Sequence, residues 1–152
     1  MESRIDLGIP PGQSLAAAQV LYDCLEEIRT IFGPRERALH VIAVSLREDR
    51  TLTSTVDHRV IGVAGTKYAG SPSLDVNGSD VFRVYSLSAF KVAFLALPFT
   101  ECAAPDELYL ETLAVVAGHR NRGIGRKLLD AALNHAAAER LTRLRLHVIE
   151  PN

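Results

Sequence analysis

The sequence has few of the residues that would mark a disulfide-stapled or metal-binding protein. Its 152 residues include only two cysteines and no tryptophan. Cys24 and Cys102 form neither a zinc-ligand spacing nor a disulfide framework, and the five histidines add no ligand pair. We therefore expect no bound metal, a reducing compartment, and each cysteine as a small buried residue.

Long apolar runs and an excess of one charge are also missing. The most apolar run, 89–99, is broken by Lys91 and Pro98 and is too short to span a bilayer. The first residues lack the basic and apolar blocks of a signal peptide. Seventeen Lys and Arg against eighteen Asp and Glu give a net charge of -1, unlike a polycation that seeks nucleic acid. We expect a soluble cytoplasmic protein that binds neither membranes nor nucleic acid.

The spacing of apolar residues predicts helices and strands in a mixed order. Ser14 and Ser79 are candidate N-caps, and Leu128, Leu129, Ala132, Leu133 and Ala136 would form the buried side of the last helix. The expected helices are 14–32, 35–47, 79–97 and 125–140, and the expected strands are 51–56, 60–66, 108–116 and 143–148. The last strand-helix-strand run predicts two parallel neighbouring strands. The length favours a single domain over residues 1–152.

The loop between the predicted 108–116 strand and the predicted 125–140 helix carries glycines and a cluster of arginines just before the helix begins. Gly123 and Gly125 lie among Arg120, Arg122 and Arg126. The first N–H groups of a helix have no internal partner and carry the positive end of its dipole, so this position predicts an anion site. A loop that follows a strand also lies where α/β proteins bind ligands.

Other glycine-loop patterns fit less well. Gly118 and Gly123 have the separation of a Walker loop, but Ile124 and Gly125 stand where its lysine and hydroxyl residue belong. A dinucleotide-binding fingerprint would need glycine at Leu128. Glycines that only permit a tight turn would leave the arginine cluster unexplained.

The pattern Arg120-x-x-Gly123-x-Gly125, with Leu113-Ala114-Val115 before it and Leu128-Leu129 after it, resembles the acetyl-CoA motif of the GNAT (Gcn5-related N-acetyltransferase) superfamily. The resemblance is strongest over 107–152. It implies an α/β (α+β) fold whose mixed, mostly antiparallel sheet is flanked by helices, with a parallel β-loop-α-β unit near the C-terminus. It also implies acetyl-CoA as cosubstrate, between the 108 and 143 strands, and no metal.

The resemblance assigns roles to residues of this loop and strand. Amides 122–126 would hold the pyrophosphate, and the Val115 N–H would bind the thioester carbonyl. Asn152 stands where the family commonly has an asparagine that begins the next motif. The implied acetyl-CoA-binding residues are Leu113, Ala114, Val115, Arg120, Asn121, Arg122, Gly123, Ile124, Gly125, Arg126 and Asn152.

Acyl transfer to an amine needs a group that takes its proton, because amines are mostly protonated at pH 7. The pleat of an unbroken strand would place Tyr109, Glu111, Leu113 and Val115 on one face. This string resembles the corresponding strand of diamine and polyamine acetyltransferases in the family, where a glutamate at this spacing assists deprotonation. We predict Glu111 as the catalytic base, with Tyr109 and Glu107 as weaker candidates.

The predicted function is an N-acetyltransferase that acts by direct attack of a small-molecule amine, a protein lysine or a protein N-terminus. Four acids without a basic residue between them (Glu101, Asp106, Glu107, Glu111) favour a cationic amine. The segment 79–97 could wall the acceptor pocket. Two alternatives stay open: a catalytically silent acyl-CoA-binding or regulatory module, and a nucleic-acid-binding protein that uses the arginines of 120–145.

Family members generally continue past the asparagine with a helix, often carrying a tyrosine that reprotonates the CoA thiolate, and two more strands. This sequence has no candidate for those parts. A sheet that ended at 143–149 would expose a strand edge, which soluble proteins usually cover or pair. We expect either a fragment of a longer product, which we favour, or a homo-oligomer whose partner covers the edge.

Overall fold

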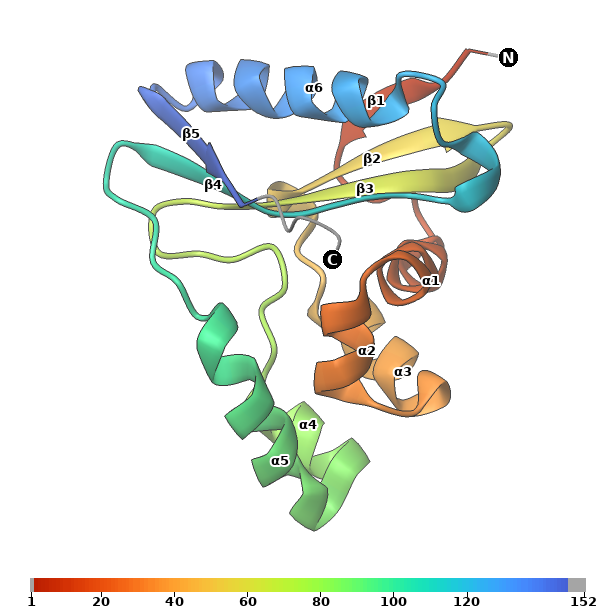
Figure 1. Ribbon diagram of the computed structural model, residues 1–152, viewed down its shortest axis with the longest axis vertical. Coiled ribbons are helices and arrows are strands. Elements are labelled where there is room, and N and C mark those ends of the chain that lie inside the picture. The colour runs from red at the N-terminus through yellow and green to blue at the C-terminus, as the bar shows by residue number, and fades with distance from the viewer. Residues whose placement is uncertain (1, 148–152) are drawn as a thin grey trace.

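A five-stranded sheet lies between one long helix and a group of shorter ones in the computed structural model, which describes residues 2–147 except the Phe99 side chain (Figure 1). The strands are β1 (Arg4–Leu7), β2 (Thr51–Val56), β3 (Arg59–Lys67), β4 (Glu107–Val115) and β5 (Arg143–Leu146), in that spatial order. All neighbours are antiparallel except β4 and β5, which are parallel. The predicted mixed sheet and its parallel unit are therefore confirmed.

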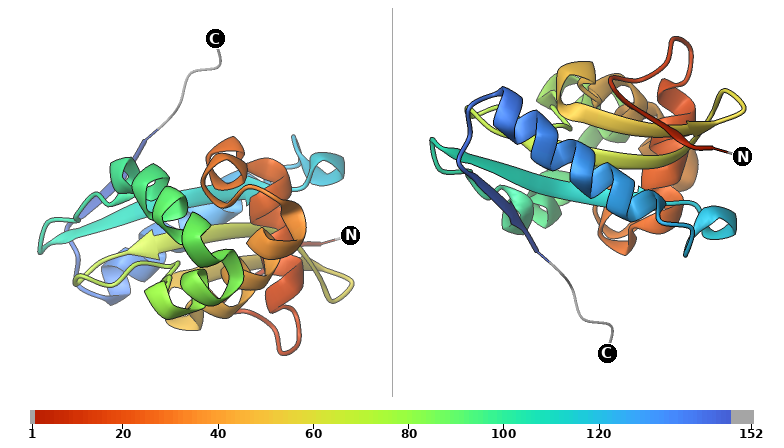
Figure 2. Two further views of the ribbon diagram at one scale, coloured as in Figure 1. Left: turned by 90° about the horizontal axis from the view of Figure 1, so that it is seen from below. Right: turned by 90° about the horizontal axis from the view of Figure 1, so that it is seen from above.

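The helices divide between the two faces of the sheet. They are α1 (Ser14–Cys24), α2 (Glu26–Phe32), α3 (Arg35–Ser45), α4 (Gly78–Tyr85), α5 (Ala89–Ala96) and α6 (Ile124–Ala138). Helix α6 covers one face alone, and the other helices lie on the opposite side (Figures 1 and 2). The sheet thus separates the glycine loop and α6 from the helices that pack beneath it.

Two predicted helices are broken in the structure. The 14–32 helix is interrupted at Leu25, whose extended backbone (φ -115°, ψ 113°) separates α1 from α2. The 79–97 helix stops at Ser86, whose positive φ of 51° cannot continue a right-handed helix. Both predictions were wrong because the apolar periodicity of the sequence continues through Leu25 and Ser86, whereas the helical backbone conformation stops at these residues.

The helix starts and the third helix also differ in detail from the predictions. Ser14 makes no capping bond, since it is the first residue of α1 rather than its cap. At α4, the Asn77 side chain accepts a hydrogen bond from the Ser79 N–H (2.9 Å), so Asn77 is the cap. Helix α3 ends at Ser45, and the extended Leu46 forms a β-bridge with Leu74.

The buried side of α6 is narrower than predicted. Leu128, Ala132 and Ala136 are buried against the sheet, but Leu133 is 48% exposed. The expected burial of both cysteines was also wrong, because Cys102 is exposed and Cys24 is only half-buried. The small residues at 132 and 136 let the helix lie close to the strands.

A buried tyrosine ties α4 to the end of α2, and its loss should destabilise the fold. The Tyr85 hydroxyl donates to the Phe32 carbonyl at 2.7 Å. Tyr85→Phe would leave that buried carbonyl without its donor, which should cost about 1–3 kcal/mol in urea denaturation. An unchanged unfolding midpoint would show that the bond contributes nothing.

The same tyrosine predicts how stability changes at alkaline pH. Burial raises the pKa of Tyr85 to about 12, above the value of about 10 for an exposed phenol. The stabilisation by the neutral phenol is therefore fully present below about pH 10 and is lost as the pH rises toward about 12. The difference in unfolding free energy between wild type and Tyr85→Phe should shrink across that window.

Candidate functional site

The start of α6 presents a concentration of backbone N–H groups. Gly123 adopts the left-handed conformation (φ 77°, ψ 5°) that turns the chain into the helix, and the first helical bond runs from the Lys127 N–H to the Gly123 carbonyl at 3.0 Å. The N–H groups of Ile124 and its neighbours at the helix start therefore have no hydrogen-bond partner within the helix. No acidic side chain lies in this first turn, so the positive end of the helix dipole is not compensated there.

Open space lies over the glycines of this loop. A Cβ added at Gly118, Gly123 or Gly125 would meet no atom within 4 Å beyond its chain neighbours and, for Gly125, the backbone of its own helix. Gly125 also lacks a positive φ, so neither packing nor backbone conformation of this chain requires glycine there. A ligand that approaches the backbone closely would require it, and a CoA pyrophosphate fits this donor set.

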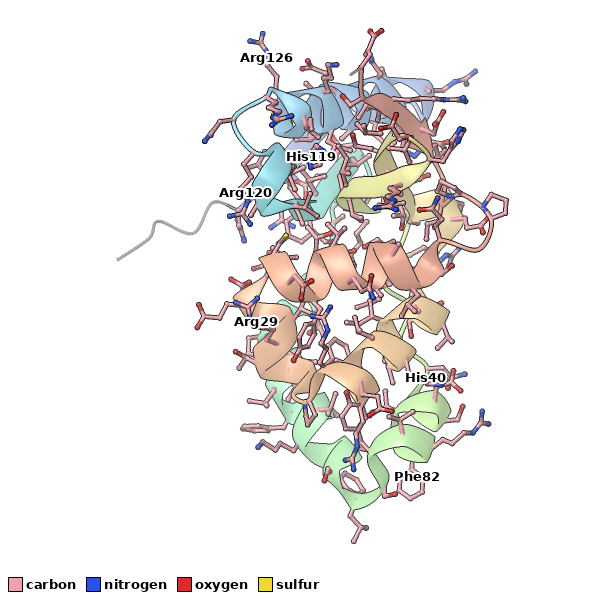
Figure 3. The ribbon with its side chains drawn as sticks, turned by 90° about the vertical axis from the view of Figure 1, so that its right-hand side faces the viewer. Arg29, His40, Phe82, His119, Arg120 and Arg126 are labelled. Atoms are coloured by element: carbon pink, nitrogen blue, oxygen red, sulfur yellow. The ribbon has the colours of Figure 1, made fainter. Side chains whose placement is uncertain are left out.

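The arginines near the loop differ in what they contact. Arg120 and Arg126 lie at the same end of the molecule, where α6 begins (Figure 3). Arg126 is exposed, with its Nε 4.0 Å from the Asp130 carboxylate. The Arg120 Nε donates to the Val115 carbonyl at 2.9 Å, so part of its guanidinium is committed to the end of β4.

Past Leu110, β4 has no paired strand on its β5 side within the described residues. Within the described residues, β5 pairs with 107–110 of β4. The Val116 N–H donates to the Ile61 carbonyl at 2.9 Å on the β3 side. Because successive N–H groups along a strand alternate in direction, the Val115 N–H points to the β5 side. The Cys24 thiol donates to the Val115 carbonyl at 3.4 Å.

Glu111 lies at an irregularity of the sheet that the sequence did not reveal. The β3–β4 register shifts between Gly65 and Thr66, so Glu111 has no paired residue opposite it. Val115 packs with the cluster beneath α6, whereas the Glu111 carboxylate is bonded by Ser73 on the opposite face. The prediction that Glu111 and Val115 share a face was therefore wrong, because the bulge removes the simple alternation.

Tyr109, a weaker candidate for the catalytic base, packs against an arginine of β5. The Arg145 guanidinium lies over its ring, 4.5 Å from the centroid, and burial raises the pKa of the Tyr109 phenol. The phenol therefore keeps its proton at neutral pH. Glu107 is equally committed, since the Arg145 Nε at 2.8 Å lowers the pKa of its carboxyl.

Strand β5 neutralises most of the acidic segment. Arg145 also contacts Glu101 at 2.7 Å, and Arg143 contacts Asp106 at 2.6 Å. The Arg143 pairing lowers the pKa of Asp106 to about 2. Among the described residues, Glu111 is thus the one of the four acids that favoured a cationic amine (Glu101, Asp106, Glu107 and Glu111) without an arginine contact.

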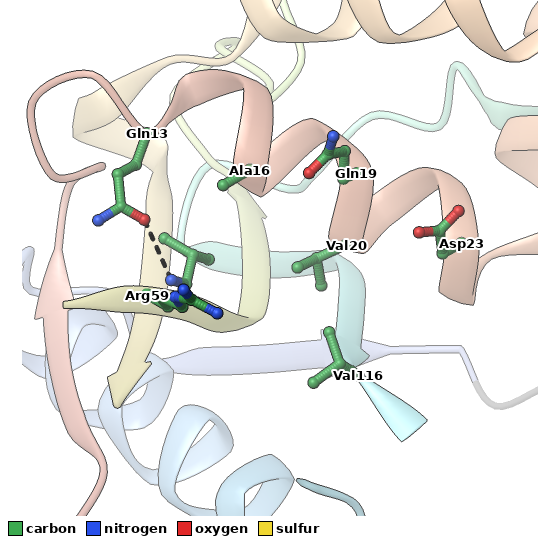
Figure 4. Close-up of a pocket in the computed structure, with 8 residues that line it drawn as sticks. Gln13, Ala16, Gln19, Val20, Asp23, Arg59 and Val116 are labelled. Carbon is green, nitrogen blue, oxygen red and sulfur yellow. Dashed lines mark hydrogen bonds between the residues drawn. The ribbon is translucent and has the colours of Figure 1, made fainter. Parts of the chain in front are cut away.

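A pocket of about 390 Å³ opens between α1 and the start of β3, next to the end of β4 (Figure 4). The Gln13 side chain closes one end by accepting from the Val60 N–H at 3.1 Å. The residues that line the pocket are Gln13, Ala16, Gln19, Val20, Asp23, Arg59, Val60 and Val116. No residue of 79–97 lines it, whereas Val84 of that segment lines a second pocket of about 590 Å³ together with Leu15, Leu39 and His40. Neither pocket is identified as the acceptor site, so the role of 79–97 as its wall stays a prediction.

Residues 2–147 form neither a metal-binding cluster nor a membrane-spanning helix. In that range no three His, Cys, Asp or Glu side chains gather in a way that could hold a metal ion. No helix there has the length and hydrophobicity needed to cross a membrane. Asn152, the last predicted acetyl-CoA ligand, lies outside the described residues.

The comparisons with known proteins identify the family. The model of the acetyltransferase (GNAT) family matches residues 21–152. The chain therefore belongs to this family, and its class is that of acetyl-CoA-dependent N-acetyltransferases. A search of curated protein sequences gives no significant match.

Solved structures support the same fold. An acetyltransferase crystal structure is 24% identical with a TM-score of 0.62, over 95% of this chain and 80% of that one. AAC(6')-Iy with a CoA-containing bisubstrate analogue is 14% identical with a TM-score of 0.61, over 100% of this chain and 83% of that one. The ribosomal-protein-S18-alanine N-acetyltransferase of Escherichia coli is 16% identical with a TM-score of 0.56, over 97% and 67%.

Proposed function

We propose that this protein transfers the acetyl group of acetyl-CoA to an amine by direct attack. The observation that carries the proposal is the uncompensated N-terminus of α6 beneath open space at Gly123 and Gly125. This donor set lies beside the end of β4, where the Val115 N–H points away from β3. A phosphate-bearing thioester could thus be bound at both its pyrophosphate and its carbonyl.

The family resemblance proposes which residues would hold acetyl-CoA, and the donors at the start of α6 are consistent with it. Amides 122–126, with the side chains of Arg122 and Arg126, would bind the pyrophosphate, and the rest of the Arg120 guanidinium would add charge nearby. The Val115 N–H would donate to the thioester carbonyl, on which negative charge develops during attack. Acetyl-CoA itself supplies the activated acyl group.

Glu111 would take the proton of the attacking amine, directly or through water. Its Oε2 accepts from Ser73, which leaves Oε1 to act on the amine. Three of the four nearby acids are paired with Arg143 or Arg145, so this segment offers one carboxylate to the acceptor. That suits an amine with a single positive charge better than a polyamine.

The acceptors of similar proteins set the choice of assay. One neighbour is an aminoglycoside N-acetyltransferase and another a ribosomal-protein-alanine N-acetyltransferase. The test incubates the protein and acetyl-CoA with three probes: a peptide with a free N-terminal alanine, a primary monoamine, and an aminoglycoside. Release of the CoA thiol and the mass of the product are measured.

Thiol release that depends on the amine, with an acetylated product, is the expected result, and the peptide and the monoamine should exceed the aminoglycoside. Binding of acetyl-CoA without acetylation of any probe would instead support the silent acyl-CoA-binding module. Tight binding to nucleic acid with steep salt dependence and no effect of acetyl-CoA would support the third interpretation.

A further inference from the structure

A loop segment that follows β3 is fixed across the face of the sheet opposite α6. We call residues 71–76 the strap. The Arg47 N–H donates to the Ser73 carbonyl at 2.8 Å, and the Asp75 N–H donates to the Ser45 carbonyl at 2.9 Å. Leu46 and Leu74 form a β-bridge between these two bonds. The end of α3 therefore holds the strap in one position over the sheet.

Ser73, at the centre of the strap, contacts Glu111 with both of its donors. Its N–H and its hydroxyl donate to the Glu111 Oε2 at 2.9 Å and 2.7 Å. Ser73 is only 3% exposed. Hydrogen bonds from two buried donors to one carboxylate oxygen are charge-assisted and directional, so they fix the rotation of the carboxylate.

The sheet is shaped to let Ser73 come this close. A Cβ at Gly65 would lie 2.3 Å from the Ser73 Oγ and 2.6 Å from the Thr112 Oγ1. The Gly65 N–H donates to the same Thr112 Oγ1 at 3.0 Å. Any other residue at 65 would displace the strap or the bulge that turns Glu111 toward it. Three features of the chain, in β3, β4 and the strap, thus converge on one carboxylate.

We propose that Ser73 is a positioning residue for the reaction, acting through Glu111. This inference rests on the proposed function, in which Glu111 accepts the amine proton. A free glutamate side chain samples several rotamers, and only some direct an oxygen at the amine. Ser73 holds Oε2 so that Oε1 stays directed at the acceptor, and the ordering is complete before substrate binds.

The test is a double-mutant cycle on the full chain, with the acceptor probe that turns over fastest. Ser73→Ala keeps the N–H donor and removes the hydroxyl, so kcat should fall roughly tenfold, as for one charge-assisted bond. The KM for acetyl-CoA should not change. In the Glu111→Gln background, Ser73→Ala should lower kcat by less than about twofold, because Ser73 has no charged oxygen left to position.

Two further variants separate positioning from general damage. Ser45→Ala removes another buried serine hydroxyl beside the strap, one without a hydrogen-bond partner among the described residues, and it should leave kcat unchanged. Gly65→Ala should lower kcat at least as much as Ser73→Ala, because its Cβ displaces the Ser73 hydroxyl. If Gly65→Ala does not fold, the Ser73 cycle alone decides.

The same cycle measured in urea tests the contact without any acceptor. Ser73→Ala and Glu111→Gln should each lower the unfolding midpoint, and the double variant should lie closer to either single variant than to their sum. Independent effects in urea or in kcat would overturn the inference. Normal turnover of Ser73→Ala with a slow Glu111→Gln would overturn the role of Ser73 alone. Normal turnover of Glu111→Gln would overturn the role of Glu111 as the base, and with it that of Ser73, whereas failure of the wild type to acetylate any amine would overturn the proposed function.

Discussion

Replacement of Glu111 by glutamine should lower turnover about 100-fold at neutral pH, the usual contribution of a positioned general base. Glutamine keeps the size of the side chain and can still accept from Ser73, whose two donors contact Oε2. It cannot take a proton, so the amine would have to lose its proton to water. The affinity for acetyl-CoA should be unchanged, because Glu111 and Val115 lie on opposite faces of β4.

The pH dependence and a matched variant make this prediction specific. The loss should shrink as the pH approaches the pKa of the acceptor amine, since free amine then becomes abundant. Glu139→Gln, an equal change at an exposed residue just past α6, should have no effect on turnover. Full activity of Glu111→Gln at pH 7 would assign proton removal to another residue or to solvent.

Replacement of Gly125 by valine should weaken acetyl-CoA binding by at least about tenfold, a loss of roughly 1.4 kcal/mol. The new side chain would occupy the open space over the loop, where an added Cβ has no atom within 4 Å apart from its chain neighbours and the backbone of its own helix. The fold should tolerate the change, because Gly125 has no positive φ. Calorimetric titration with acetyl-CoA measures the affinity, and thermal unfolding checks the fold.

Another glycine at a helix start provides the control. Gly78 is the first residue of α4, also has open space at its Cβ and also lacks a positive φ. Gly78→Val should therefore leave acetyl-CoA affinity unchanged. Gly123→Val is a poorer probe, because its φ of 77° would add backbone strain to any loss of binding. Unchanged affinity in Gly125→Val would place the cosubstrate elsewhere.

The β4-loop-α6-β5 unit could be predicted from the sequence because its signals are local. Leu144 and Leu146 alternate with Arg143 and Arg145, and the glycines directly precede an amphipathic helix. Strand β1 was not predicted, since four residues with two charges give too short a pattern. The break at Leu25 was not predicted, because no glycine or proline marks it in the sequence.

The candidate site was only partly predictable because its decisive contacts join distant residues. Glu111 and Ser73 are 38 positions apart, and Arg145 and Glu101 are 44 apart. The residues of β4 itself give no sign of the bulge that turns Glu111 away from the Val115 face. The one available signal was Gly65 within a strand, since an isolated glycine there often marks a bulge or a close approach.

Thermal unfolding of the wild-type chain with different ligands tests the central claim, that the start of α6 binds acetyl-CoA, most directly. At about a hundred times its dissociation constant, acetyl-CoA should stabilise the fold by roughly 2.7 kcal/mol, while ATP and NAD at equal concentration should do little. The melting temperature should rise with acetyl-CoA concentration and should not rise in Gly125→Val. Stabilisation by ATP or NAD without stabilisation by acetyl-CoA would contradict the account.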